Sequence, residues 1–270
     1  MATESAPRSM GPSAPISTAC FPRATVVVLG HGSRTAAANH SFLAVVQRVA
    51  ALSALADVRG AFLQLATPDL AEVLALPDLA ERVLVVPTLL FAAGHLKRDL
   101  PALVDAARRR TQRAIVATGP LAASAAMVNL GVALARGVIQ RIPQRCTLVV
   151  VGRGSSDREA ILAFDRVAAT IGRELGIPVE PAFVAATAPS VEIALSRVRT
   201  PGAVVLPLMV SAGQVVYAIE AACAAFRVGR PDVHIEVAPH LGGHEQFSAA
   251  LAEHVLGELR ARDWAAPSPR

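Results

Sequence analysis

The chain has 270 residues, enough for one large domain or two of ordinary size. Hydrophobic residues make up 53% and charged residues 17%, which excludes a largely disordered chain and leaves ample material for buried cores. The net charge of +5 indicates either a compositional bias toward arginine or an acidic ligand. Because no nucleic-acid-binding module is visible, an anionic small molecule is the better candidate ligand.

The first 24 residues are rich in Pro, Ser and Ala and lack a continuous apolar segment, so we expect a tail rather than a signal peptide. Cys20, Cys146 and Cys223 include no CxxC pair and predict neither a disulfide framework nor a thiolate metal site. The uncharged stretch 114–135 is long enough for a membrane span, but a Gly-Pro pair and an asparagine interrupt it. We therefore expect a soluble cytoplasmic protein.

In chain order, four short apolar segments bounded by Gly or Pro predict parallel strands buried on both faces, at 25–29, 58–64, 82–86 and 113–117. Between them lie amphipathic stretches with helical spacing, such as the apolar residues at 42, 45, 46 and 49. Alternating strands and helices predict an α/β fold with right-handed crossovers.

The second half of the chain repeats the first. Segment 25–33 is matched by 147–155, an offset of 122 residues. Further matches keep the same order, with an offset that drifts by only three residues: 67–68 with 188–189, 85–87 with 205–207, 94–95 with 213–214, and 119–121 with 238–240. Chance would not preserve that order. Strands are therefore also predicted near 147–151, 179–184, 203–208 and 233–237.

These patterns predict a disordered tail at 1–24, a first repeat at 25–136, a second repeat at 147–262 and a tail at 263–270. A short link near 137–146 joins the two repeats. Each repeat is expected to be a four-stranded parallel sheet flanked by helices, and the two to pack as a pseudo-dimer within a monomer. Ligands of such sheets bind beyond the carboxyl ends of the strands. The loops after the first and third strands of each repeat should therefore face one cleft.

Two of these loops each carry a histidine. His31 lies between two glycines after the first strand, and His95 follows a glycine after the third. A neutral imidazole binds divalent iron, cobalt, nickel or zinc and can transfer protons near neutral pH. Neither histidine lies on an apolar helical face. The pair is therefore predicted to form a metal site with catalytic potential rather than two core histidines.

Two other interpretations of the first loop are weaker. Its Gly-x-Gly after a strand resembles the start of a dinucleotide loop, but the third glycine of that motif would fall at Thr35. No GK[ST] motif is present, so no nucleotide cofactor is expected, although a nucleotide-binding α/β protein stays a competing hypothesis. Ser33 lacks the GxSxG surroundings of a hydrolase nucleophile.

Four segments together resemble the class II chelatases that act on sirohydrochlorin in cobalamin and sirohaem synthesis: GHGSR at 30–34, AFLQLATP at 61–68, VVP at 85–87 and GHLKRDLP at 94–101. The resemblance covers 25–262, and the second half is similar to the degenerate repeat of the long form of that family. It implies a lyase-type chelatase that inserts Co²⁺ or Fe²⁺, as substrate, into a polycarboxylated tetrapyrrole without ATP. Nickel is a further candidate substrate, because it suits the same imidazole ligands. His31 and His95 would then hold the metal and help remove the pyrrole protons.

The resemblance also implies substrate contacts. Arg34, Lys97 and Arg98 could pair with substrate carboxylates through charge-assisted hydrogen bonds, although an ordinary solvated surface explains them equally well. Ser33 and Gly94 belong to the same predicted substrate site, where the small residues at 92–94 leave room for a flat ring.

Two positions depart from the family pattern. Where the family often has a carboxylate as third metal ligand, this chain has Gln64, whose neutral amide can coordinate a metal but cannot accept a proton. We expect weaker metal affinity, or compensation by a carboxylate such as Asp57 or Asp99. The second-repeat counterparts of the two histidines are Arg153 and Gln214, so one metal site is expected and Arg153 could bind substrate carboxylates.

The change at Gln64 leaves open a second hypothesis, a non-catalytic tetrapyrrole- or metal-binding protein with a chelatase fold. His240 and His244 have a spacing that permits a metal pair near the start of the last helix, but they have no counterpart in the first repeat. The other histidines are expected to be structural or at the surface: His40, His234 and His254.

Overall fold

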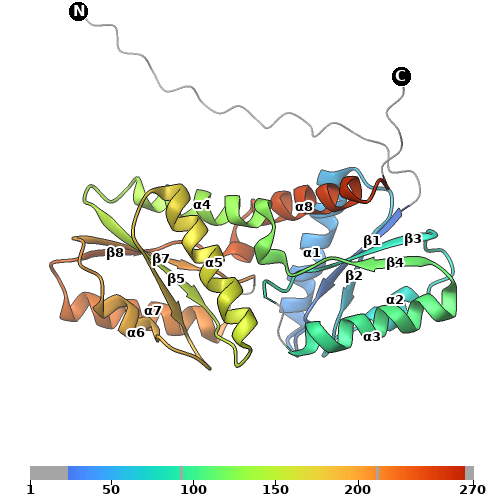
Figure 1. The fold of residues 1–270 in the computed structure, drawn as a ribbon, viewed down its shortest axis with the longest axis horizontal. Helices are drawn as coiled ribbons and strands as arrows, with labels where there is room; N and C mark the ends of the chain where they lie inside the picture. Colours follow the sequence, from blue (N-terminus) through green and yellow to red (C-terminus); the bar gives the residue numbers. More distant parts are fainter. Residues whose placement is uncertain (1–23, 92–93, 211–212, 265–270) are drawn as a thin grey trace, which may run out of the picture.

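The computed structural model describes residues 24–91, 94–210 and 213–264, in which strands and helices alternate (Figure 1). The first repeat contains β1 (Ala24–Gly30), α1 (Ala36–Ser53), β2 (Val58–Phe62), α2 (Leu70–Leu74), β3 (Arg82–Pro87), α3 (Gly94–Thr111), β4 (Ala114–Ala117), the 3₁₀ turn η1 (Leu121–Ala123) and α4 (Ala125–Ile139). The second contains β5 (Cys146–Gly152), α5 (Arg158–Leu175), β6 (Val179–Phe183), α6 (Val191–Ser196), β7 (Gly202–Pro207), α7 (Gln214–Gly229), β8 (His234–Val237), η2 (Leu241–Gly243) and α8 (Phe247–Ala261).

Every predicted strand is present, with ends within two residues of the prediction. The predicted link is shorter than expected, because α4 continues to Ile139 and β5 begins at Cys146. Of the predicted N-terminal tail, only Ala24 is described, and it begins β1. The uncharged stretch 114–135 forms β4, η1 and much of α4, and no helix in the described ranges is long and apolar enough to cross a membrane.

The strands form two parallel four-stranded sheets, with the orders β2-β1-β3-β4 and β6-β5-β7-β8. In the first sheet Gly30 pairs with Phe62, and Leu29 pairs with Pro87. The carboxyl ends of β1, β2 and β3 therefore meet at one edge. The central strands β1 and β5 are buried along their whole length, which explains their uninterrupted apolar sequences.

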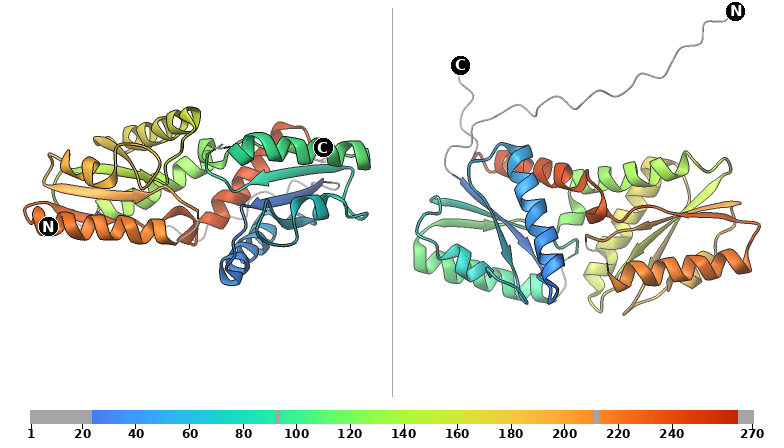
Figure 2. Two further views of the ribbon diagram at one scale, coloured as in Figure 1. Left: turned by 90° about the horizontal axis from the view of Figure 1, so that it is seen from below. Right: turned by 180° about the vertical axis from the view of Figure 1, so that it is seen from behind.

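The last helix of each repeat packs against the other repeat (Figure 2). Helix α8 lies along α1, where Arg48 Nε donates to the buried Ser248 Oγ at 3.0 Å. Helix α4 lies against α5 and β7, and a Cβ at Gly131 would be only 2.9 Å from Ile171 Cδ1. Because of this exchange of helices, the two repeats share more packing contacts than two separately folded domains would share through a surface interface.

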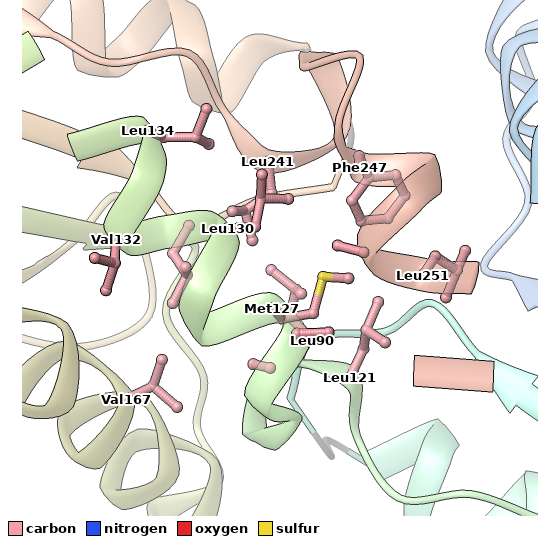
Figure 3. Packing of buried hydrophobic residues seen from close by; sticks show 14 of the residues in the cluster. Leu90, Leu121, Met127, Leu130, Val132, Leu134, Val167, Leu241, Phe247 and Leu251 are labelled. Atoms are coloured by element: carbon pink, nitrogen blue, oxygen red, sulfur yellow. The ribbon is translucent and has the colours of Figure 1, made fainter. Parts of the chain in front are cut away.

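The exchange produces one central core shared by both repeats. It contains the inner faces of both sheets together with α4 and α8. Met127 on α4 is 1% exposed and lies near Leu90 and Leu121 of the first repeat and Leu251 of the second (Figure 3). The outer face of each sheet has a separate core, beneath α2 and α3 in the first repeat and beneath α6 and α7 in the second.

The structure corrects one detail of the repeat alignment. Pro120 immediately precedes η1, as His240 precedes η2, and the backbone N–H groups of Thr118 and Ala238 donate to Val85 and Val205 respectively. Segment 119–121 therefore corresponds to 239–241 and not to 238–240. Pattern matching placed these residues one position early because a Pro-Leu pair in one repeat was set against a Pro-His pair in the other.

Replacing Gly131 with valine should destabilise both repeats together. The new side chain would be forced against Ile171, and overpacking of this kind typically costs about 1–3 kcal/mol. Chemical denaturation should show one cooperative transition at lower denaturant. Gly137→Val on the same helix is the control, because no atom lies within 4 Å of a Cβ there. Equal losses in the two variants, or separate transitions for the repeats, would contradict the shared core.

Candidate metal and substrate site

His31 lies at the carboxyl end of β1, where backbone hydrogen bonds hold its loop against the chain after β2. Leu63 N donates to Gly30 O at 2.8 Å, and Gln64 N donates to His31 O at 3.1 Å. Gly32 has a φ of +88°, and a Cβ at this position would lie 1.7 Å from the carbonyl oxygen of Gln64. Only glycine fits there, so the second glycine of the motif fixes His31 beside Gln64.

Asn39, in the first turns of α1, holds the same loop from the other side. Its Oδ1 accepts from Ser33 N at 2.9 Å and its Nδ2 donates to Ser33 O at 2.8 Å. The Ser33 hydroxyl in turn accepts from Thr35 N at 3.1 Å. Sequence analysis missed Asn39, although an asparagine shortly after a glycine-rich loop is a usual source of such backbone contacts.

The imidazole of His31 is exposed and both of its nitrogens have partners. Nδ1 lies 3.1 Å from Gly32 O, and Nε2 lies 3.0 Å from Gln64 Nε2. Because a carbonyl only accepts and an amide nitrogen only donates, Nδ1 carries the proton and Nε2 presents its lone pair to Gln64. A backbone carbonyl that holds Nδ1–H is a common support for a histidine that binds metal through Nε2. A flip of the Gln64 side-chain amide would place its oxygen where its nitrogen now lies.

His95 belongs to the first turn of α3 and not to a loop, as the sequence had suggested. Helix α3 starts at Gly94 and continues through Pro101, because Leu100 and Val104 are buried against the sheet at 3% exposure each. The predicted small residues Ala92 and Ala93 lie outside the described residues, as do the side chains at 94–96. The backbone of His95 follows β3, which pairs with β1, so both histidines lie at the same sheet edge.

The strand ends of the two repeats face one another near α3 and α5. Lys97 Nζ lies 2.6 Å from Asp157 Oδ2 and 2.7 Å from Glu159 Oε2, both at the start of α5. Phe91, in the loop after β3, packs edge-on against Phe164 of α5 with ring centroids 5.6 Å apart. The hydrogen bond between Lys97 and Asp157 raises the pKa of the lysine and lowers that of the aspartate.

The predicted substrate-binding cations therefore divide into two kinds. Lys97 is already paired with carboxylates of the second repeat. Arg34, Arg98 and Arg153 are exposed, and the side chain of none of them forms a hydrogen bond or ion pair with another described residue. Their guanidinium groups stay available to an external anion.

The second repeat reproduces the backbone of the first site with different side chains. Gly154 has a φ of +92°, and a Cβ there would lie 1.7 Å from Ala185 O. Arg153 thus takes the place of His31, and Ala185 takes that of Gln64. Neither an arginine nor an alanine side chain ligates a cation.

The expected compensation by Asp57 is wrong. Asp57 lies at the amino end of β2, where its carboxylate accepts from the Thr25 hydroxyl and pairs with Arg59. The strand rises by about 3.3 Å per residue, so roughly 20 Å of chain separates Asp57 from Gln64. Asp99 lies on α3, four residues after His95, and its side chain is exposed. Compensation by Asp99 stays a prediction.

His240 and His244, whose spacing permits a metal pair, flank η2. His240 Nδ1 accepts from Gly243 N at 3.0 Å and the ring also bonds to the Met209 backbone, while burial lowers its pKa. His244 Nδ1 accepts from Gln246 N at 3.3 Å. Across the described ranges, no three His, Cys, Asp or Glu side chains are grouped so that they could hold a metal ion. His240 is therefore a capping residue.

The remaining histidines and cysteines lie where they were expected. His40 and His234 are exposed, and His254 is partly buried with a pKa lowered by burial. Cys146 and Cys223 are buried free thiols, and burial raises the pKa of Cys223 to about 11. Such thiols do not form a thiolate metal site. Cys20 lies outside the described residues.

Fold and site together define a two-repeat α/β protein with one histidine-bearing sheet edge. The model of the CbiX family matches residues 25–136 and again residues 147–257. The chain therefore belongs to the CbiX family and carries two copies of its domain. A sirohydrochlorin cobaltochelatase of Priestia megaterium is 25% identical over 240 residues, which cover 85% of this chain and 78% of that protein.

Solved structures agree with the fold. SirB from Bacillus subtilis with Fe³⁺ has a TM-score of 0.76 at 22% identity, covering 90% of this chain and 96% of that one. A CbiX described as the terminal enzyme for biosynthesis of sirohaem in denitrifying bacteria has a TM-score of 0.61 at 22% identity, covering 86% and 98%. The predicted fold, two tandem chelatase-like domains packed as a pseudo-dimer, is confirmed.

Proposed function

We propose that this protein inserts a divalent metal ion, Co²⁺ or Fe²⁺, into sirohydrochlorin without ATP. The observation that carries the proposal is the orientation of His31, whose Nε2 lone pair points to Gln64 at the sheet edge where α3 brings His95. The family membership of the chain and its relative of similar length support the same activity. Nickel suits the same imidazole ligands and is a further candidate substrate.

The chain's own residues would act in sequence. His31 and His95 bind the metal and leave its other coordination positions open toward the macrocycle, as a catalytic site requires. When the metal binds, the hydrogen bond between Gln64 Nε2 and His31 Nε2 breaks, and Gln64 rotates its amide oxygen toward the metal. Arg34, Arg98 and Arg153, with Ser33 and Gly94 beside them, hold the carboxylated rim of the ring. Each histidine, once it has released the metal, can accept a pyrrole proton.

A spectrophotometric assay tests the proposal directly. Purified protein is mixed with sirohydrochlorin and with Co²⁺, Fe²⁺ or Ni²⁺ in parallel, under anaerobic conditions, and the absorbance change of the macrocycle is followed. We expect insertion to be faster than in protein-free controls for at least one metal. Equal rates with and without protein for all three metals would refute the proposal.

One observation favours a second function, that of a tetrapyrrole or metal carrier without turnover. The Gln64 amide nitrogen donates to His31 Nε2, whose lone pair is then not free to bind a metal, and the amide cannot act as a base. A carrier would bind the macrocycle or the metal stoichiometrically, without accelerating insertion. The same samples distinguish the two functions, because titration gives binding and the time course gives turnover.

Replacing Gln64 with glutamate should raise the affinity for Co²⁺ by roughly 10-fold, because a carboxylate adds a charged oxygen ligand beside His31. Isothermal titration calorimetry measures the change. Gln140→Glu, at the exposed C-terminal end of α4, is the control for the altered net charge. If Gln64→Glu gains no more affinity than the control, Gln64 is not at the metal.

A further inference from the structure

Lys97 is the only lysine in the chain, and it links the two repeats at the edge that carries the histidines. It lies two residues after His95 in α3, and its ammonium contacts carboxylates on both sides of Arg158, the first residue of α5. A lysine ammonium is a compact charge that can serve two carboxylates at once. The Lys97 side chain thereby ties the start of α5 to the start of α3.

Arg158 is left without a partner by this arrangement. Its sequence neighbours Asp157 and Glu159 are both engaged by Lys97, and Asp157 Oδ1 also accepts from Glu159 N at 2.9 Å. The Arg158 side chain is exposed and forms no hydrogen bond or ion pair with another residue in the described part of the chain. Arg153, in the loop that leads to α5, is free in the same way.

This triplet of acid, arginine and acid is specific to the second repeat. The positions that correspond to it in the first repeat are Thr35, Ala36 and Ala37, which carry no charge. Arg153 likewise replaces the metal-binding histidine. At these positions the second repeat thus has two guanidinium groups, unpaired among the described residues, where the first repeat has a histidine and an alanine.

We infer that Arg158 acts with Arg153 as a carboxylate-binding wall for the macrocycle, and that Lys97 is a positioning residue which occupies Asp157 and Glu159. Without Lys97 the two acids would stand unneutralised beside Arg158 and would repel an anionic ligand. Guanidinium groups bind carboxylates through two parallel hydrogen bonds, a geometry that suits the rim of a polycarboxylated tetrapyrrole. The identity of that ligand rests on the proposed function.

Equilibrium binding to metal-free protein tests the role of Arg158. Sirohydrochlorin is titrated with the full chain and the absorbance of the macrocycle is followed, with a porphyrin bearing two carboxylates as a second probe. Arg158→Gln should weaken binding of sirohydrochlorin about 10-fold, as expected for loss of a bidentate charged contact, and should change binding of the second probe less. Arg166→Gln removes the same charge from an exposed position on the same helix and should cost less than about twofold. Equal effects of the two substitutions overturn the inference.

A second set of variants tests the role of Lys97. Lys97→Met should weaken binding of sirohydrochlorin, and adding Asp157→Asn and Glu159→Gln should restore it to nearly the parent affinity, because no unneutralised acid is then left to repel the ligand carboxylates. Asparagine retains the helix cap at 157. If Lys97 instead bound the macrocycle itself, the triple variant would stay as weak as Lys97→Met.

Metal insertion measured on the same samples separates the two proposals. Binding that depends on Arg158 without insertion of any metal supports the carboxylate wall and refutes the chelatase activity. Insertion with equal affinities for Arg158→Gln and Arg166→Gln refutes the wall alone. A parent chain that binds no sirohydrochlorin refutes both.

Discussion

Replacing His31 with alanine should abolish metal insertion, with kcat/KM at least about 100-fold below the parent value, because a direct ligand matters at least as much as the groups that orient it. The fold should survive. His31 is exposed, and among the described residues its side chain bonds only to Gly32 and Gln64, so the free energy of unfolding should change by no more than about 0.5 kcal/mol. His95→Ala should have a comparable effect on insertion.

His40→Ala is the matched control for these variants. His40 is an exposed imidazole on α1 of the same repeat whose side chain forms no hydrogen bond or ion pair with another described residue, and its loss should leave insertion unchanged. Anaerobic insertion assays measure the rates, and circular dichroism with thermal unfolding measures the fold. If His31→Ala and His95→Ala both retain the parent rate, neither histidine holds the metal.

Replacing Gly32 with alanine should be the most damaging single change at the site. The new Cβ would collide with the Gln64 carbonyl oxygen at 1.7 Å, and the φ of +88° is unfavourable for any residue with a side chain. We expect a loss of about 3–5 kcal/mol in the free energy of unfolding, at the upper end of single-residue effects. Affinity for Co²⁺ should also be lost, because the loop that holds His31 beside Gln64 must move.

Two other glycines provide the controls for this substitution. Gly154→Ala makes the same collision with Ala185 O in the second repeat, and should cost similar stability while sparing Co²⁺ affinity. Gly119→Ala, in the loop after β4, meets no atom within 4 Å and should be nearly neutral. Urea denaturation and Co²⁺ titration measure the two quantities. Gly32→Ala protein that keeps parent Co²⁺ affinity would show that the loop does not position a metal ligand.

Local pattern was sufficient for the strands and for the first loop. Segment 26–29 is uninterrupted valine and leucine because both faces of β1 are buried, so its boundaries follow from composition alone. The glycines on both sides of His31 indicated a constrained turn, and the backbone contact between Gly32 and Gln64 is its cause. The repeat was visible because both copies preserve these same turns.

Other features depended on which surfaces meet. The apolar faces of α4 and α8 predict burial, but a periodic pattern does not specify which sheet covers them, so the exchange of helices was not predictable. His95 was assigned to a loop because it closely follows the third strand and a glycine, whereas α3 starts at Gly94 and continues through Pro101, since burial of Leu100 and Val104 outweighs the missing backbone donor. The helix exchange and the start of α3 both depend on tertiary packing, which a local sequence pattern does not specify.

The paired histidines illustrate the same division. The sequence by itself determined the two-repeat α/β fold, the edge at which His31 and His95 lie, and the absence of a second histidine pair in the other repeat, because strand burial and loop glycines are encoded locally. Only the tertiary structure decided that Gln64 faces the lone pair of His31, that Asp57 lies at the opposite edge, and that Lys97 pairs with the second repeat. Those contacts join residues far apart in the chain, and their energy depends on distances that no single segment specifies.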